Sequence, residues 1–428
     1  MGSSGRFRFN PKTAIPVAER GTRFVIEVFG FNRLIASTND RRLPELQMHF
    51  HPIRQDAVLT SGYWCKDMVP APPDKINDLA EESGMRFSPG IYEHAAALVG
   101  ESPCTVSRDA ALLFQAQYSA WQRYRHPMLV AGIDVYNIEP EILGAGLNSP
   151  GGSEVPSIIS HPFAAVEKIL QAEAPDPGRD GRMPMILDVA ARLSRECQPA
   201  KVYVPICGPL AFGNGLVGMD EMLCTMMEDP DLVRRALLHL AEIQSSYVRA
   251  ILKTGARPLI FESGASPPLL PPVLFPEIEA PALGRLFEVC RESGDPAPAC
   301  ILGGDVAPVL PHLLALNPGF LICPSETDQK NFVDMAAEYP HVEVRINMPV
   351  ASILEPDWDK ATAAADAAIA LASRIKTGSV GTGVVPFNTS PDRLLRLRDY
   401  VENGDFETGS PFRYRNRDYV ENSTKKKP

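Results

Sequence analysis

Carboxylate side chains follow several short apolar segments of this sequence, at the points where those segments end. The clearest is Glu262, which ends the apolar segment 259–261, and Asp305 and Glu326 come soon after two later segments of the same kind. If the segments are strands of one parallel sheet, residues at their carboxyl ends gather at one rim. Carboxylates gathered in this way raise one another's pKa, so one of them can hold a proton near neutral pH and act as an acid. We therefore predict that Glu262, Glu326 and Asp305 are catalytic.

Further polar side chains lie at or just after the expected strand ends, where they would contact a substrate. They are Ser263, Asp134, Tyr136, Asn347, Asn388 and His94. Most of these side chains also have a structural interpretation, because Asp, Asn and Ser accept hydrogen bonds from backbone N–H groups at turns and helix starts. Both interpretations stay open from the sequence.

Candidate metal ligands are few and weak. His49 and His51 would put two imidazoles on one face of a strand, which is half of a metal site. Cys300 and Cys323 end apolar segments, where buried thiols are usually inert. None of the eight cysteines forms a Cys-x-x-Cys pair, so we expect neither a zinc ribbon nor a thioredoxin-like motif.

The apolar segments alternate with helical patterns over most of the chain, for example at residues 161–172 and 277–291. Strands are expected near residues 87, 130, 157, 203, 260, 301, 322, 344 and 382. Alternation of strands and helices predicts a parallel sheet, and about eight such units predict a closed (β/α)8 TIM-type barrel. An open doubly wound sheet is the second choice, and it is weaker because no Gly-x-Gly-x-x-Gly follows an early strand.

Three regions are expected along the chain. Residues 1–72 do not share the later alternation and end in a proline cluster, so we predict an N-terminal extension that packs on the main body or reaches to a second copy in a homodimer. Residues 73–404 form the barrel, and residues 405–428 are a polar C-terminal tail.

The composition limits the partners. The chain has 428 residues, 45% of them hydrophobic and 22% charged, with a net charge of -10. The negative charge argues against a nucleic-acid or anionic-membrane partner. No apolar run approaches the roughly 20 residues that span a bilayer, and the N-terminus lacks a signal pattern. We therefore expect a cytoplasmic protein.

Several short segments follow one another in an order that is typical of one superfamily. They are Ala97-Leu-Val-Gly-Glu-Ser-Pro103, Ile138-Glu-Pro-Glu-Ile-Leu-Gly144, Cys207-Gly-Pro209, Glu228-Asp-Pro-Asp-Leu-Val233, Phe261-Glu-Ser-Gly-Ala-Ser266 and Gly383-Val-Val-Pro386. Together they resemble the uroporphyrinogen decarboxylase superfamily, over residues 85 to 402. That superfamily contains porphyrinogen decarboxylases and corrinoid-linked methyltransferases.

Departures from the superfamily narrow the function that the resemblance implies. Porphyrinogen decarboxylases carry an Arg-Gln-Ala-Gly-Arg segment near the start, which nothing here matches, and a histidine where this chain has Thr382. The zinc-dependent methyltransferases hold their metal with His-x-Cys-Gly and a later cysteine, where this chain has Leu302 and Gly383. The comparison argues against porphyrinogen decarboxylation and against a zinc site.

The resemblance implies transfer of a methyl group from a small O-, N- or S-methyl donor to a corrinoid (cobalamin). Because the chain has no Asp-x-His-x-x-Gly segment, the corrinoid would arrive on a carrier protein. Two alternatives stay open. One is a cofactor-independent lyase that decarboxylates a small acid bound by Arg345 or Arg257. The other is a barrel without chemistry that binds a ligand or partner through residues 1–72.

Overall fold

The computed structural model describes residues 24–26, 34–36 and 85–404. Contacts divide the chain into two units, Met1–Pro72 and Pro73–Pro428. In the first unit, β1 (Phe24–Ile26) pairs antiparallel with β2 (Leu34–Ala36). The candidate ligands His49 and His51 and the tail 405–428 lie outside the described residues.

The second unit is built around one parallel sheet of eight strands, so the predicted barrel is confirmed. The strands are β3 (Phe87–Gly90), β4 (Met128–Val130), β7 (Lys201–Cys207), β8 (Arg257–Glu262), β9 (Ala299–Leu302), β10 (Phe320–Cys323), β11 (Glu343–Met348) and β12 (Gly378–Val384). They pair in the order β3-β12-β11-β10-β9-β8-β7-β4. Among the described residues no ladder joins β3 to β4, so the sheet is nearly closed.

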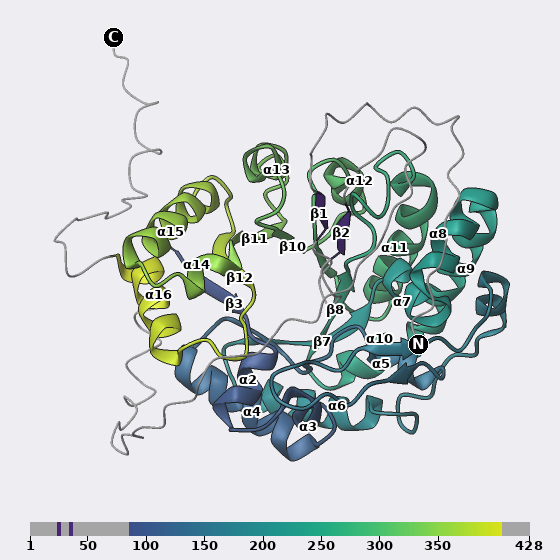
Figure 1. Ribbon diagram of the computed structural model, residues 1–428, viewed down its shortest axis with the longest axis horizontal. Coiled ribbons are helices and arrows are strands. Elements are labelled where there is room, and N and C mark those ends of the chain that lie inside the picture. Colours follow the sequence, from purple (N-terminus) through teal and green to yellow (C-terminus); the bar gives the residue numbers. More distant parts are fainter. Residues whose placement is uncertain (1–23, 27–33, 37–84, 405–428) are drawn as a thin grey trace, which may run out of the picture. The chain divides into compact units, whose positions relative to one another are not determined.

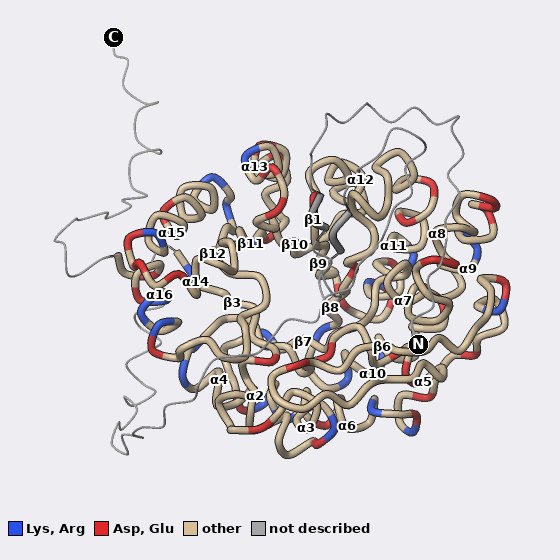
Figure 2. Tube along the Cα trace, in the orientation of Figure 1, with Lys and Arg blue, Asp and Glu red and all other residues tan. Residues whose placement is uncertain are grey.

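Helices surround this sheet (Figure 1). They are α2 (Glu93–Leu98), α3 (Pro103–Val106), α4 (Ala110–Tyr124), α5 (Ile138–Ile142), the 3-10 helix η2 (Val166–Gln171), α6 (Met183–Glu196), α7 (Pro209–Val217), α8 (Met219–Glu228), α9 (Pro230–Ile243), α10 (Ser245–Lys253), α11 (Phe275–Glu292), α12 (Leu310–Ala315), α13 (Gln329–Ala336), α14 (Val350–Leu354), α15 (Trp358–Ala372) and α16 (Pro391–Asn403). Figure 2 shows that Lys, Arg, Asp and Glu lie mainly on the helices and loops, whereas the strands carry few of them. None of the described helices has the length and apolar run needed to cross a lipid bilayer.

Side-chain caps fix where several of these helices begin. Asp109, Asp229, Asp328 and Ser390 each accept a hydrogen bond from a backbone N–H in the first turn of α4, α9, α13 and α16. Such caps satisfy donors that have no partner inside the helix. The caps of α13 and α16 follow the loops after β10 and β12, so they help to set where those loops end.

Two predicted elements differ from the structure. The strand expected near residue 157 is β6 (Ile158–Ser160), which pairs antiparallel with β5 (Gly146–Leu147) outside the barrel. Its Ile159 is 67% exposed, whereas a barrel strand is buried on both faces. The helix expected over 161–172 is reduced to η2, whose buried Val166 and Ile169 are three residues apart, as the 3-10 period requires.

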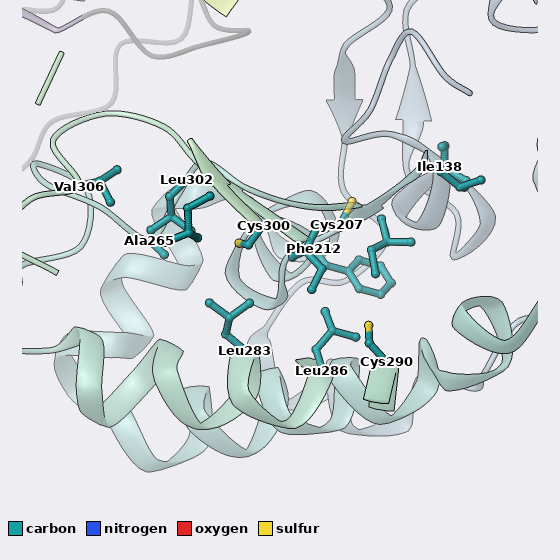
Figure 3. Packing of buried hydrophobic residues seen from close by; sticks show 14 of the residues in the cluster. Ile138, Cys207, Phe212, Ala265, Leu283, Leu286, Cys290, Cys300, Leu302 and Val306 are labelled. Atoms are coloured by element: carbon teal, nitrogen blue, oxygen red, sulfur yellow. The ribbon is translucent and has the colours of Figure 1, made fainter. Parts of the chain in front are cut away.

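Side chains of the barrel strands alternate between two layers. Phe261, Ile301 and Ile322 belong to the cluster inside the barrel. Cys300 and Leu302 belong to the larger cluster between sheet and helices, and Figure 3 shows them on the side of the sheet that faces Leu283 and Leu286 of α11. Because paired residues of neighbouring strands share a face, the strand register shows which candidate residues point to the barrel axis.

Candidate functional site

An aromatic cluster lies at the carboxyl end of the barrel. Phe261 of β8 faces the barrel interior. The ring of Tyr92, two residues after β3, packs edge-on against it with 5.9 Å between centroids. The ring of Tyr136, in the loop after β4, does the same at 5.8 Å. Three strands that are far apart in sequence therefore supply one apolar surface that carries two phenol hydroxyls.

The phenols in this cluster are neutral donors. Burial raises the pKa of Tyr92 to about 12, although the charge of Arg345 lowers it in part. Burial also raises the pKa of Tyr136 well above its usual value, and a hydrogen bond with Ser263 acts in the opposite direction. Tyr136 and Ser263, both predicted as substrate contacts, are thus brought together here.

A carboxyl group that was not among the predicted residues stands beside this cluster. Glu93 directly follows Tyr92 and opens α2. Burial raises the pKa of Glu93 to about 7, and a hydrogen bond from its own backbone N–H acts in the opposite direction. The charge of Glu93 in turn raises the pKa of Tyr92, which places the two groups close together. A carboxyl with a pKa near 7 can hold a proton at neutral pH and release it.

The sequence predicts His94, and not Glu93, as a substrate contact in this segment. In the structure His94 is enclosed by other residues of the fold. It is fully buried, with Nε2 at 2.7 Å from the hydroxyl of Tyr124 and Nδ1 at 3.3 Å from the carbonyl oxygen of Phe387. Burial lowers the pKa of His94. The ring therefore ties α2 to α4 and to the loop after β12. The signal available in the sequence was position alone, since Glu93 is the first acidic residue after the first strand.

Two polar residues of β11 face the barrel axis. Arg345 pairs in register with Ile322, which belongs to the interior cluster, and Asn347 follows two residues later on the same face. Nε of Arg345 donates to Oδ1 of Asn347 at 3.0 Å, and both residues are buried. Asn347, a predicted substrate contact, thus lies inside the barrel with a cation beside it.

Glu262 faces the opposite side of the sheet. It pairs in register with Leu302, which packs in the layer between sheet and helices. Its carboxylate accepts hydrogen bonds from the backbone N–H groups of Leu210 at 3.0 Å, Ala211 at 3.1 Å and Gly264 at 3.1 Å. The structure therefore uses Glu262 to cap the N-terminus of α7, where the positive end of the helix dipole favours a carboxylate.

A second buried carboxyl, Glu279 of α11, lies against Glu262. Burial and then the charge of Glu262 raise the pKa of Glu279 well above its usual range. Burial also raises the pKa of Glu262 to about 7, opposed by the N–H groups of Ala211 and Gly264. Glu279 is therefore the neutral member of the pair. The sequence placed Glu279 within a helix and gave no sign of its partner.

Asp305 and Glu326 lie in neighbouring loops, after β9 and β10. Oδ1 of Asp305 accepts a hydrogen bond from the hydroxyl of Thr327 at 2.8 Å, and that hydroxyl accepts one from the N–H of Ala307 at 2.8 Å. Asp305 is half-buried, whereas Glu326, next to Thr327, is exposed. The structure thus brings these two loops together and leaves Glu262 on the other face of the sheet.

The remaining predicted contacts lie in other surroundings. Both oxygens of Asp134 are taken by Arg182, at 2.8 Å and 2.7 Å, and the Asp134 side chain is 2% exposed. Arg182 also pairs with Glu141 at 2.7 Å. Asp134 therefore anchors the loop after β4 to the start of α6. Asn388, in the loop after β12, is exposed to solvent.

The cysteines considered as metal ligands do not point into the barrel. Cys300 and Cys323 both belong to the layer between sheet and helices, and burial raises the pKa of both thiols. A zinc ligand must be a thiolate, which this surrounding disfavours. Within residues 85–404, no group of three or more His, Cys, Asp or Glu side chains could hold a metal ion. The cysteines therefore do not fit a zinc site.

The fold and the clustered residues at the carboxyl end define a parallel α/β barrel protein. The uroporphyrinogen decarboxylase (URO-D) family model matches residues 90–401. That span is more than half of the chain, so the protein belongs to the uroporphyrinogen decarboxylase family.

Solved structures share the barrel. One of them is a methyltransferase from Methanosarcina mazei, which is 19% identical, with a TM-score of 0.64. The match covers 75% of this chain and 95% of that chain. At this identity the likeness shows the fold alone. A comparison with curated proteins found no match.

Proposed function

We propose that the protein is a methyltransferase that moves a methyl group from a small O-, N- or S-methyl donor to a corrinoid carried by a partner protein. The observation that carries the proposal is the ring cluster of Tyr92, Phe261 and Tyr136 with a carboxyl beside it, that of Glu93, whose pKa burial raises to about 7. Membership of the uroporphyrinogen decarboxylase family and a methyltransferase of the same fold support it.

Methyl transfer needs a proton at the atom that loses the methyl group. As the methyl–heteroatom bond breaks, the oxygen, nitrogen or sulfur takes the electron pair, and protonation makes it a better leaving group. Glu93 in its acid form supplies that proton and is left as a carboxylate. Asp305 and Glu326 are the other candidate acids, but Asp305 accepts from Thr327 and Glu326 is exposed.

The aromatic cluster positions the donor. Tyr92, Phe261 and Tyr136 offer ring faces and edges to a small apolar group, while the Tyr92 and Tyr136 hydroxyls fix its orientation. These rings also keep water away from the reacting carbon, which suits transfer to an acceptor other than water. When bound on its carrier, the corrinoid supplies the nucleophile that accepts the methyl group.

The test is an assay of methyl transfer by the full chain to free reduced cobalamin. The change in visible absorbance of the cobalamin measures the rate. We expect methylcobalamin to form with at least one of three donors: 3-methoxybenzoate, N,N-dimethylglycine or 3-(methylthio)propionate. Glu93→Gln is expected to lower the rate on the order of 100-fold, within the range for loss of an acid catalyst. Glu326→Gln tests the other candidate acid and is expected to keep most of the rate, because Glu326 is exposed. An equal loss in both variants, or none in Glu93→Gln, contradicts the assignment.

A lyase is the second candidate, and one observation favours it. Arg257 is paired with Asp295 at 2.5 Å, whereas Arg345 faces the barrel axis with only Asn347 as a hydrogen-bond partner among residues 85–404. A decarboxylase of a small acid would use such a cation. Release of CO2 from these acids without cobalamin would favour the lyase over the methyltransferase.

A further inference from the structure

Arg345 is a buried cation without a counter-charge. It is 3% exposed, and in the part of the chain described here no carboxylate pairs with it. Its one hydrogen bond, to Oδ1 of Asn347, uses Nε and leaves both terminal nitrogens of the guanidinium unused. A guanidinium stays charged in proteins. Burying it unpaired is costly, so such a group indicates a missing anion.

Other arginines of the barrel have a carboxylate of this chain as their counter-charge. Arg182 lies 2.7 Å from Oδ2 of Asp134, and Arg257 lies 2.5 Å from Oδ1 of Asp295. Both reach a carboxylate of this chain. Arg345 does not, although it is more deeply buried than Arg257.

The neighbours of Arg345 leave room for it instead of pairing with it. A Cβ on Gly381 of β12 would lie 2.5 Å from Cδ and 2.8 Å from Cγ of Arg345. Glycine at this position therefore makes space for the arginine stem, and also for the backbone oxygen of Ser88, which would lie 2.3 Å from the same Cβ. Tyr92 lies close enough for the Arg345 charge to lower the pKa of its phenol. Among the described residues the phenol has no hydrogen-bond partner of its own, so it can donate to the same anion.

We propose that Arg345 and Tyr92 form a subsite for the carboxylate of an organic acid, whose apolar body lies against Phe261 and Tyr136. The two free guanidinium nitrogens match the two oxygens of a carboxylate. That this acid is the methyl donor rests on the proposed function, whereas binding of the carboxylate does not. The subsite therefore restricts the donors to methylated acids.

Calorimetric titration of the full chain with benzoate, benzyl alcohol and inorganic phosphate tests the subsite. Benzoate is expected to bind, and benzyl alcohol and phosphate are not. Arg345→Met should weaken benzoate on the order of tenfold to a hundredfold, as loss of a charged hydrogen-bonding pair does. Arg249→Gln, an exposed arginine of α10, is the control and should bind benzoate normally.

Thermal unfolding separates a binding role from a structural one. If the charge of Arg345 is paired only when a ligand binds, Arg345→Met should leave the midpoint of thermal unfolding equal or higher, because the substitution removes an unpaired buried charge. A lower midpoint, unchanged benzoate binding, or phosphate binding in place of benzoate overturns the subsite. So does the absence of benzoate binding to the unmodified protein at millimolar concentration.

Matched donors connect the subsite to the proposed function. Suppose that 3-methoxybenzoate donates its methyl group, that methoxybenzene does not, and that Arg345→Met abolishes the transfer. This result supports both the subsite and the methyltransferase. Benzoate binding without transfer from any acid refutes the methyltransferase and leaves the subsite standing. Transfer from methoxybenzene at an equal rate refutes the subsite and leaves the methyltransferase standing.

Discussion

At the residue scale, the acidic groups of this barrel separate by what surrounds them. Glu93 borders the aromatic cluster with a pKa near 7, whereas Glu262 caps α7 on the other face of the sheet. Glu279 lies against Glu262 and is neutral because burial raises its pKa. A raised pKa alone therefore does not mark a substrate site, because burial raises the pKa of Glu93 beside Tyr92 and also that of the Glu262–Glu279 pair on the other face of the sheet.

The sequence predicted that polar residues follow the strands, but not which way they point. Residues 258–262 are buried on both faces, so the segment shows no alternation that would reveal its inner face. A shift of one residue exchanges the two faces, and Glu262 falls on the outer one. Ser263, Tyr136 and Asn347 were correctly expected near strand ends. The sequence indicated Arg345 only for the lyase alternative and did not indicate Glu93, because the burial of both side chains depends on segments far away in sequence.

Glu279→Gln should change how the free energy of unfolding depends on pH. In the folded protein the pKa of Glu279 lies well above 4.5, so its stabilising contribution is complete below that pH and is lost as pH rises through the folded pKa. Gln does not titrate and can still donate to Glu262. Between pH 5 and pH 9 the free energy of unfolding of the variant should therefore rise, relative to that of the unmodified protein, by on the order of 1–3 kcal/mol.

Urea unfolding at three pH values measures this difference. Glu288→Gln, on the exposed face of the same helix, serves as the control. Parallel pH curves for Glu279→Gln and the unmodified protein would show that Glu279 is ionised in the fold.

At the element scale, helix starts and strand register place the site. β8 gives Phe261 to the barrel interior and Glu262 to the start of α7, so one strand serves both layers. Gly208 permits this contact, because a Cβ there would lie 2.3 Å from Oε2 of Glu262. The helices were largely predictable from their periodicity and caps. The hairpin of β5 and β6 was not predictable, because a short apolar segment such as Ile158–Ser160 has the same pattern inside and outside a barrel.

Glu262→Ala should destabilise the protein through α7. The N–H groups of Leu210 and Ala211 lose their acceptor in a buried place. We expect the free energy of unfolding to fall by about 2–4 kcal/mol. The fall combines the cost of leaving buried N–H donors without an acceptor and the cost of a small cavity. Asp109→Ala, which removes the exposed cap of α4, should lower the free energy of unfolding by about 1 kcal/mol. Chemical denaturation compares the two, and an equal or smaller loss for Glu262→Ala contradicts the capping role.

At the scale of the whole molecule, the barrel brings Tyr92, Tyr136, Phe261 and Arg345 together from β3, β4, β8 and β11. Each follows or belongs to a different strand, and the sheet order places β3 and β4 at its two edges. The sequence alone predicted the barrel because strand and helix alternate, and the family match over 90–401 agrees with it. Which side chains meet across the axis depends on the register of all eight strands.

The pH profile of methyl transfer, measured on the unmodified protein and on Glu93→Gln, tests the central claim that Glu93 delivers the proton at this end of the barrel. Because the acid form is the active one, the rate should be constant at low pH and fall as pH rises through about 7, the pKa of Glu93. In Glu93→Gln the rate should be low and should not fall near pH 7. A variant that keeps both the rate and the fall near pH 7 would contradict the account.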